Sequence, residues 1–273
     1  MGDALTAAGH RVRLVELVTT GDRWSATGSE AAPDRGMFVK ELEQALLAGE
    51  ADIAVHSAKD MPTQLPDGLD VLAVPPREDP RDVLVAAGAL ESLAQGATVG
   101  TGSPRRSAQL LTARPDLRVV PIRGNVDTRL RRRDEGDVHA VVLAMAGLSR
   151  LGRHRVDLTP LHPDVCTPAA GQGLLALEGR AGDEAVSLAV AALDDLTSRT
   201  CLQVERAVLA GLGGGCLSPV GVLCTPDADG LRVTAFAAAD ADGTDARRVT
   251  VHDAIAGPEA LAGRVVQALM GAR

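Results

Sequence analysis

A strand that passes through a glycine and serine loop into a helix is encoded by Ala97-Thr98-Val99-Gly100-Thr101-Gly102-Ser103-Pro104-Arg105-Arg106. Its first four residues favour a strand, Ser103 suits a helix N-cap, and Pro104 suits the first helical position. The N–H groups of such a helix start, with Arg105 and Arg106 as bidentate donors, can bind an anion. The alternative is a capped helix on the protein surface.

The same alternation of strand and helix continues along the chain and predicts an α/β fold with a covered parallel sheet. Strands are predicted at residues 11–19, 53–57, 70–74, 83–86, 97–100, 117–122, 138–144 and 174–178. Helices are predicted at residues 3–8, 36–47, 126–133, 183–196 and 198–209. Strands at residues 220–224, 231–237 and 247–252, followed by a helix at 258–270, predict a small α+β unit at the C-terminus.

Two segments rich in proline or glycine are candidate crossings between domains. The first is Pro75-Pro76-Arg77-Glu78-Asp79-Pro80-Arg81-Asp82, and the second is Thr167-Pro168-Ala169-Ala170-Gly171-Gln172-Gly173. Crossings on both sides of one strand–helix unit imply that this unit is inserted into the first domain. We therefore expect domain 1 at residues 1–76 and 174–194, domain 2 at 80–168, and domain 3 at 197–273.

Polar side chains follow the predicted strands at the ends where α/β folds bind ligands. They are His56, Ser57, Lys59 and Asp60 after the second strand, and Arg123, Arg129 and Arg150 further along. Arginine forks suit a ligand with several carboxylates, and Asp60 is a candidate general acid or base. The alternatives are a loop with local hydrogen bonds for residues 56–60 and a solvated helix face for most arginines of residues 129–133.

A cysteine follows three glycines in Leu212-Gly213-Gly214-Gly215-Cys216-Leu217-Ser218-Pro219-Val220-Gly221. Glycine permits a loop that presents the thiol to a cleft, so Cys216 is a candidate covalent anchor. The alternative is a small buried side chain in a glycine-rich turn. The remaining cysteines, Cys166, Cys201 and Cys224, lie beside apolar segments, and no C-x-x-C spacing suggests a zinc or redox pair.

Composition narrows the possible classes of protein. The chain has 273 residues, 45% of them hydrophobic, and a net charge of −8, which fits a soluble protein with an ample core. Aromatic residues make up 1% of the chain, so base stacking on nucleic acid has little to use. We expect no membrane segment, no signal peptide and no metal site, and a cytoplasmic location.

Eight stretches, spread in order along the chain, resemble the hydroxymethylbilane synthase (porphobilinogen deaminase) family. They are residues 37–43 (Met-Phe-Val-Lys-Glu-Leu-Glu), 55–62 (Val-His-Ser-Ala-Lys-Asp-Met-Pro), 77–82 (Arg-Glu-Asp-Pro-Arg-Asp), 100–106 (Gly-Thr-Gly-Ser-Pro-Arg-Arg), 122–130 (Ile-Arg-Gly-Asn-Val-Asp-Thr-Arg-Leu), 146–152 (Ala-Gly-Leu-Ser-Arg-Leu-Gly), 168–173 (Pro-Ala-Ala-Gly-Gln-Gly) and 214–216 (Gly-Gly-Cys).

This resemblance implies three domains, the first two similar to the lobes of periplasmic binding proteins. It implies a monomeric transferase of tetrapyrrole and heme biosynthesis that carries a dipyrromethane cofactor on Cys216 through a thioether. Such an enzyme adds four porphobilinogen molecules to this primer, loses ammonia at each step, and releases hydroxymethylbilane by hydrolysis.

The resemblance also implies roles for individual residues. Asp60 would stay close to the pyrrole nitrogens, stabilise the cationic azafulvene formed when ammonia leaves, and handle protons, with His56 and Lys59 beside it. The residues expected to be catalytic are Asp60, Lys59, Arg123 and Arg150. The residues expected to bind the cofactor are Cys216, Ser103, Arg105, Arg106, Arg129, Gln172, Lys59 and Asp60.

Two departures from the family pattern bear on activity. The loop of residues 29–36 retains only Arg35-Gly36 where the family carries Lys and paired Gly, and the family's N-terminal signature with an Arg and a Ser is absent. We expect the gene product to begin upstream of Met1 and the chain as written to have little activity. An impaired form, or a binding module for a small anion, is therefore the alternative function; Cys216 and Asp60 favour the enzyme.

Overall fold

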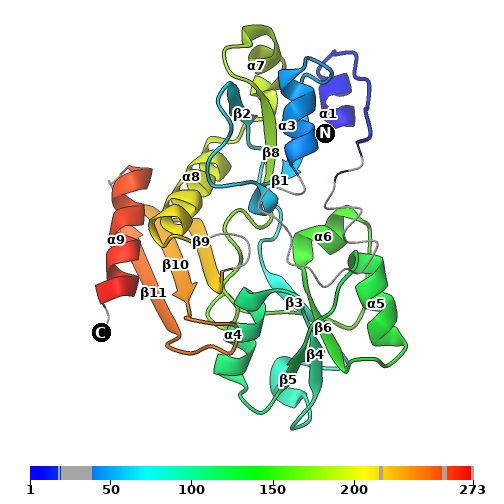
Figure 1. Cartoon of the computed structure of the whole chain (residues 1–273), viewed down its shortest axis with the longest axis vertical. Coiled ribbons are helices and arrows are strands. Elements are labelled where there is room, and N and C mark those ends of the chain that lie inside the picture. Colours follow the sequence, from blue (N-terminus) through cyan, green and yellow to red (C-terminus); the bar gives the residue numbers. More distant parts are fainter. Residues whose placement is uncertain (18, 20–38, 215–217, 254–256, 272–273) are drawn as a thin grey trace.

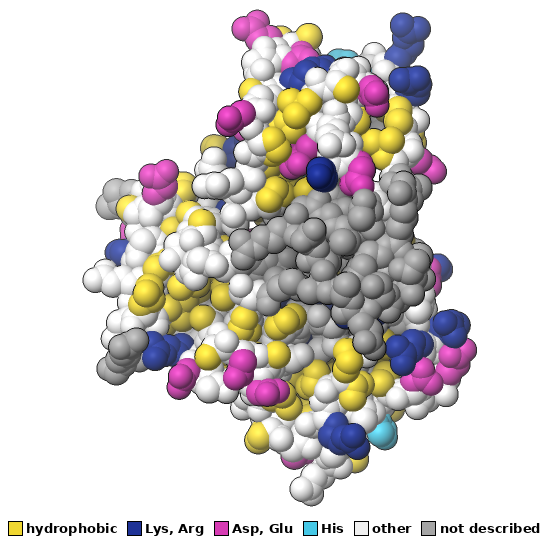
Figure 2. Space-filling model, in the orientation of Figure 1, with side chains coloured by type: hydrophobic (Ala, Val, Ile, Leu, Met, Phe, Trp, Pro, Cys, Tyr) yellow, Lys and Arg dark blue, Asp and Glu magenta, His cyan; other side chains and the backbone are white. Residues whose placement is uncertain are grey.

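The computed structural model describes residues 1–17, 19, 39–214, 218–253 and 257–271. Within them the strands form three sheets, each with helices packed against it, and the mixed α/β fold is confirmed (Figure 1). Acidic and basic side chains are interspersed on the face in Figure 2. No helix in these ranges is long and apolar enough to cross a bilayer.

The first sheet has the strand order β1-β8-β2, formed by Ala54–Ser57, Leu175–Arg180 and Leu69–Ala73. In sequence, strand β8 follows all the strands of the second sheet, yet it belongs to the first sheet and pairs antiparallel with both β1 and β2. Helix α3 (Lys40–Leu47) packs Leu46 against this sheet, and helix α1 (Gly2–Ala7) packs Leu5 near α7 (Glu184–Val190).

The predicted strand at residues 11–19 is not present. Residues 11–17 and 19 have no strand assignment, and side chains 11–17 are exposed, including Leu14 at 81%. Their alternating pattern favours a strand only if a neighbouring strand supplies hydrogen bonds and a buried face. In the described part of the chain β1 pairs with β8 alone, so that neighbour is lacking.

The second sheet has the order β5-β4-β6-β3-β7. Its strands are β3 (Asp82–Val85), β4 (Thr98–Gly100), β5 (Arg118–Val120), β6 (Ala140–Ala144) and β7 (Leu158–Pro160). The expected parallel sheet is correct only for β5, β4 and β6, because β3 pairs antiparallel with β6 and β7. The chain enters this sheet directly from the first crossing, and that entry fixes the direction of β3.

Helices α4 (Pro104–Ala113), α5 (Val126–Asp134) and α6 (Met145–Arg150) follow β4, β5 and β6 in the chain. Apolar clusters cover both faces of the sheet, one around Leu84, Val99 and Leu110, the other around Val83, Ile122 and Val141. Short 3-10 helices lie at Ala58–Asp60 (η1), Leu90–Ser92 (η2) and Ala191–Leu193 (η3).

The C-terminal unit is an antiparallel sheet, β11-β10-β9, covered by two helices (Figure 1). The strands are β9 (Val220–Asp227), β10 (Gly230–Ala237) and β11 (Arg247–Asp253), and the helices are α8 (Leu196–Gly211) and α9 (Pro258–Gly271). Its core joins Val204 and Val208 of α8 to Leu261 and Val265 of α9. The predicted elements of this region are all present, with ends shifted by a few residues.

Candidate active site

Lys59 and Asp60 lie in η1, directly after strand β1. The Ala58 N–H donates to the Leu174 carbonyl at 3.0 Å, which fixes the turn against the start of β8. Burial lowers the pKa of Lys59, and the adjacent Asp60 carboxylate partly opposes that shift. The site therefore places a desolvated ammonium beside the carboxylate that is the candidate acid or base.

His56 makes its polar contact with a residue outside this pair. Its Nε2 lies 2.8 Å from Oε2 of Glu178 on β8, and both side chains are buried. His56 is thus part of the sheet that supports η1, and it makes its contact with Glu178 rather than with Asp60.

Helix α4 begins as the sequence predicts, with Ser103 at the N-cap and Pro104 in the first turn, but the Ser103 side chain makes no capping bond. The Ser103 carbonyl instead accepts from the Ser107 N–H at 3.0 Å. Arg105 and Arg106, in the first turn, are only 4% and 5% exposed. The interpretation of residues 103–106 as a capped surface helix is wrong for these two arginines.

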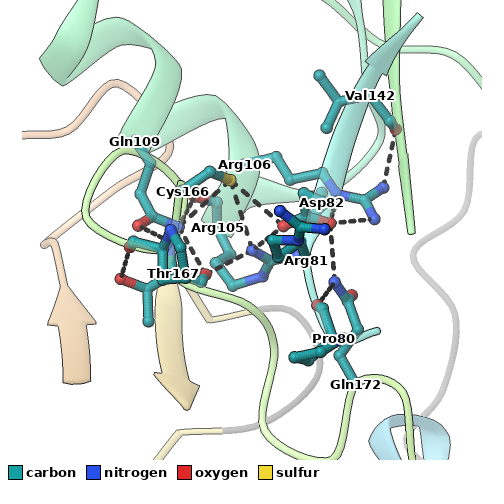
Figure 3. A network of polar contacts seen from close by, with 12 residues as sticks. Pro80, Arg81, Asp82, Arg105, Arg106, Gln109, Val142, Cys166, Thr167 and Gln172 are labelled. Carbon is teal, nitrogen blue, oxygen red and sulfur yellow. Dashed lines mark hydrogen bonds and ion pairs between the residues drawn. The ribbon is translucent and has the colours of Figure 1, made fainter. Parts of the chain in front are cut away.

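A single carboxylate, Asp82 at the start of β3, holds both arginines (Figure 3). Asp82 Oδ2 accepts from Arg105 Nη1 at 2.6 Å, and Oδ1 accepts from Arg106 Nε and Nη2 at 2.9 and 2.7 Å. Burial alone would raise the pKa of Asp82, but the charges of Arg105 and Arg106 hold it well below its usual range. The two arginines therefore favour the ionised form of Asp82 despite its burial.

The same two arginines also donate hydrogen bonds to backbone carbonyl groups. Arg105 Nη1 also donates to the Thr167 carbonyl at 2.6 Å, and Arg106 Nη1 donates to the Val142 carbonyl at 3.0 Å. Among the described residues, Nε and Nη2 of Arg105 have no acceptor, so this guanidinium retains donors for a ligand.

Gln172 joins the second crossing to this network. Its Nε2 donates to Asp82 Oδ1 at 2.9 Å and to the Pro80 carbonyl at 2.8 Å, and the side chain is 1% exposed. Both neighbours are acceptors, which fixes the orientation of the amide. The Oε1 atom of Gln172 is buried without a hydrogen-bond partner among the described residues.

Arg129 and Arg150 are held by backbone carbonyls near the same place. Arg129 Nε donates to Gly124 at 2.8 Å, and Arg150 Nη2 donates to Gly173 at 2.8 Å. Burial lowers the pKa of both side chains, and the nearby Arg106 lowers that of Arg129 further. By contrast, Arg131 and Arg132 form exposed ion pairs, as expected for a solvated helix face.

The structure thus gathers most of the predicted residues around the two crossings. Lys59 interacts electrostatically with Asp60, Arg106, Asp82 and Arg105, and Arg129 interacts with Arg106. Arg123, in the loop before α5, also takes part in an interaction. Cys216 and the loop at residues 29–36 lie outside the described residues, as do Met37 and Phe38.

Two buried acids of this region were not singled out in the sequence. Asp82 ends a charged segment but begins an apolar strand, and Glu205 occupies an apolar face of α8. Glu205 Oε1 lies 2.6 Å from Arg77 Nη1, and Glu205 Oε2 accepts from the Gly171 N–H at 2.6 Å. An acid inside an apolar pattern was the available signal, because a buried carboxylate needs a cationic partner.

Models of a known family match nearly the whole chain. The model described as "Porphobilinogen deaminase, dipyromethane cofactor binding domain" matches residues 1–188, and "Porphobilinogen deaminase, C-terminal domain" matches residues 199–271.

Curated relatives agree with these matches. A porphobilinogen deaminase of Roseiflexus castenholzii is 49% identical over 84% of this chain and 77% of its own length. That of Desulforudis audaxviator is 47% identical over 95% and 85%, and that of Acidothermus cellulolyticus is 46% identical over 90% and 76%.

A solved substrate-binding protein of an amino acid ABC transporter aligns with a TM-score of 0.33 at 15% identity, over 62% of this chain and 75% of that one. The assignment rests on the sequence matches: the chain belongs to the porphobilinogen deaminase family.

Proposed function

We propose that this protein is a transferase of tetrapyrrole biosynthesis, a hydroxymethylbilane synthase. It joins four porphobilinogen molecules into a linear tetrapyrrole on a dipyrromethane primer. The observation that carries the proposal is that Lys59 and the exposed carboxylate of Asp60 lie beside the buried, Asp82-bound arginines at the two crossings. A protein that only bound a small anion would need the arginines but not a carboxylate at the position of Asp60.

The charges of the site fit a dipyrromethane. Each pyrrole of that group carries an acetate and a propionate, and the site offers Lys59, Arg105, Arg106 and Arg129 against the carboxylates of Asp60 and Asp82. The free Nε and Nη2 donors of Arg105 suit a carboxylate, since charge-assisted bonds are the strong ones. When bound, the dipyrromethane would supply the pyrrole carbon onto which the first porphobilinogen unit is joined.

Asp60 is the proposed catalytic carboxylate. Positive charge develops on the pyrrole of porphobilinogen as ammonia leaves, and a fixed carboxylate stabilises it without reorganisation. The same group accepts the proton lost when aromaticity returns. Lys59, adjacent to Asp60 in η1, is placed to bind a substrate carboxylate.

Arg150 and Arg123 are proposed to hold the carboxylates of incoming porphobilinogen, and Ser103 those of the cofactor. Arg150 is already fixed to the Gly173 carbonyl of the second crossing, so a carboxylate bound there would be positioned relative to that crossing. Cys216 is proposed as the thioether anchor; the described residues on either side of its loop, Gly214 and Ser218, connect α8 to β9.

Incubation with porphobilinogen tests the proposal. The account predicts release of ammonia and formation of a linear tetrapyrrole in a molar ratio of about four to one, since each condensation frees one amine. Binding of porphobilinogen without release of ammonia would instead assign the chain to the class of anion-binding modules, and would refute the enzyme.

A further inference from the structure

We propose that Asp82 is a positioning residue for the reaction: it fixes the guanidinium groups of Arg105 and Arg106 before the cofactor is present. The inference rests on the proposed function above. Figure 3 shows Asp82 between the two side chains, with Gln172 of the second crossing on its other side.

The number and the origin of its donors distinguish Asp82 from an ordinary ion-pair partner. Its two oxygens accept from Arg105 and Arg106 of α4, from Gln172, and from the Cys166 thiol at 3.3 Å. The carboxylate is fully buried, so water does not compete for these bonds. Each guanidinium is therefore restricted by a bond at a defined oxygen as well as by a carbonyl.

Restriction of this kind matters because long side chains lose entropy when they bind a ligand. Fixing an arginine rotamer in advance removes that loss from the binding step. Asp82 also compensates one of two adjacent positive charges, and without it two buried guanidinium groups would repel each other and turn toward solvent. The pair, so compensated, keeps one net positive charge for a ligand carboxylate.

Through its hydrogen bond with Gln172, Asp82 also links the arginine pair to the second crossing. The same carboxylate oxygen that holds Arg106 accepts from a side chain of the second crossing. The Gln172 carbonyl in turn accepts from Arg77 of the first crossing, at 2.7 Å from Nη2. The orientation of the arginine pair is thereby set relative to both crossings and not only to helix α4.

The first test uses the Cys216→Ser variant, which cannot form the thioether and leaves Asp82 unchanged. The probe is NMR of ¹⁵N-labelled arginine side chains, in which hindered guanidinium rotation gives separate Nη signals. Positioning by Asp82 predicts hindered rotation for Arg105 and Arg106 in Cys216→Ser as in the loaded protein, assigned by loss of each signal in Arg105→Lys and Arg106→Lys. Free rotation of both groups in Cys216→Ser would overturn the proposal.

The second test is Asp82→Asn, with Asp157→Asn as a matched control. Asp157 also bridges two arginines, Arg155 and Arg133, but in the described part of the chain its side chain has no hydrogen bond or ion pair with the crossings or with α4. In Asp82→Asn we expect the fraction of chains carrying dipyrromethane, measured by intact mass, to fall by about 10- to 150-fold, the worth of one charge-assisted bond. In the loaded fraction KM for porphobilinogen rises, and kcat per loaded chain stays within about twofold of the parent.

Asp157→Asn is expected to load like the parent even if its unfolding temperature falls. Full loading and an unchanged KM in Asp82→Asn would show that Asp82 serves stability alone. The proposed function fails separately: the unaltered protein would then carry no adduct and release no ammonia, whereas the arginine NMR of Cys216→Ser would still report on Asp82.

Discussion

Asp60 and Lys59 are neighbours in one turn, yet their environments differ. Burial lowers the pKa of Lys59, and the Asp60 carboxylate is the largest of the influences that oppose this shift. The Asp60 side chain itself is exposed, so its carboxylate is accessible to a pyrrole on which the proposed reaction develops positive charge.

Replacing Asp60 with Asn should preserve the fold and the attached cofactor but reduce turnover by about 10²- to 10⁴-fold, the range for general acid–base groups. The measurement is single-turnover condensation of porphobilinogen by loaded protein. Asp67→Asn is the control, since Asp67 lies exposed in the loop before β2. A near-normal rate in Asp60→Asn would remove Asp60 from the mechanism.

At the scale of elements, the second crossing has two glycines that lie in close contact with the backbone of other segments. Gly171 has φ of +75° and a Cβ there would lie 2.9 Å from the Lys59 nitrogen; Gly173 has φ of +85° and a Cβ would lie 2.4 Å from the Glu78 carbonyl oxygen. The Glu78 N–H donates to the Gly173 carbonyl at 3.1 Å. Backbone thus packs on backbone where the two crossings meet.

Gly173→Ala should therefore lower the free energy of unfolding by about 1–3 kcal/mol more than Gly96→Ala does. Gly96 has a similar φ of +75° but nothing within 4 Å of the added Cβ, so it controls for backbone strain alone. Denaturant unfolding of both variants measures the difference. Equal losses would mean that the close approach of the crossings contributes nothing to stability.

The elements that the sequence predicts correctly are those with local signals. The strand, loop and helix at residues 97–106 depend on propensity and on Ser103 and Pro104, and they form as expected. Pairing is not local: β8 inserts between β1 and β2, about 100 residues from its partners in the chain, and β3 runs antiparallel to β6. No sequence pattern within those strands predicts which strand each one pairs with, or whether the pairing is parallel or antiparallel.

The residues of the candidate site likewise fall into those that the sequence identifies and those that it does not. Motif residues such as Lys59, Asp60 and Arg129 were identified from sequence and converge in the structure. Asp82 and Glu205 were not, because their function depends on partners brought from other elements. The burial of Arg105 and Arg106 could not be predicted from the sequence either, because their hydrogen-bond partners are Asp82, Thr167 and Val142, which come from other segments of the chain.

For the whole molecule, one buried ion pair ties the crossings to the C-terminal unit. Arg77 of the first crossing binds Glu205 of α8 with two nitrogens and the Cys224 carbonyl of β9 with one of them, and Glu205 also accepts from the Gly171 and Cys224 N–H groups. Glu205 is fully buried. In the chain, Cys216 lies between two elements, α8 and β9, that are both hydrogen-bonded to the crossings.

Glu205→Gln leaves the Arg77 charge buried and uncompensated, so it should lower the free energy of unfolding by about 3–5 kcal/mol. Glu135→Gln, which removes an exposed pair with Arg131, should cost less than about 0.5 kcal/mol. Calorimetry or chemical denaturation of both variants decides between them. A loss for Glu205→Gln as small as that for Glu135→Gln would show that the pair does not stabilise the assembly of the three sheets.

Intact mass spectrometry of the purified protein tests most directly whether this chain works through a dipyrromethane attached to Cys216. The account predicts a mass increment of one dipyrromethane on the unaltered chain and none on Cys216→Ser, while Cys166→Ser, Cys201→Ser and Cys224→Ser retain it because those thiols are buried. An unaltered chain without the increment, or a Cys216→Ser variant that keeps it, would contradict the account.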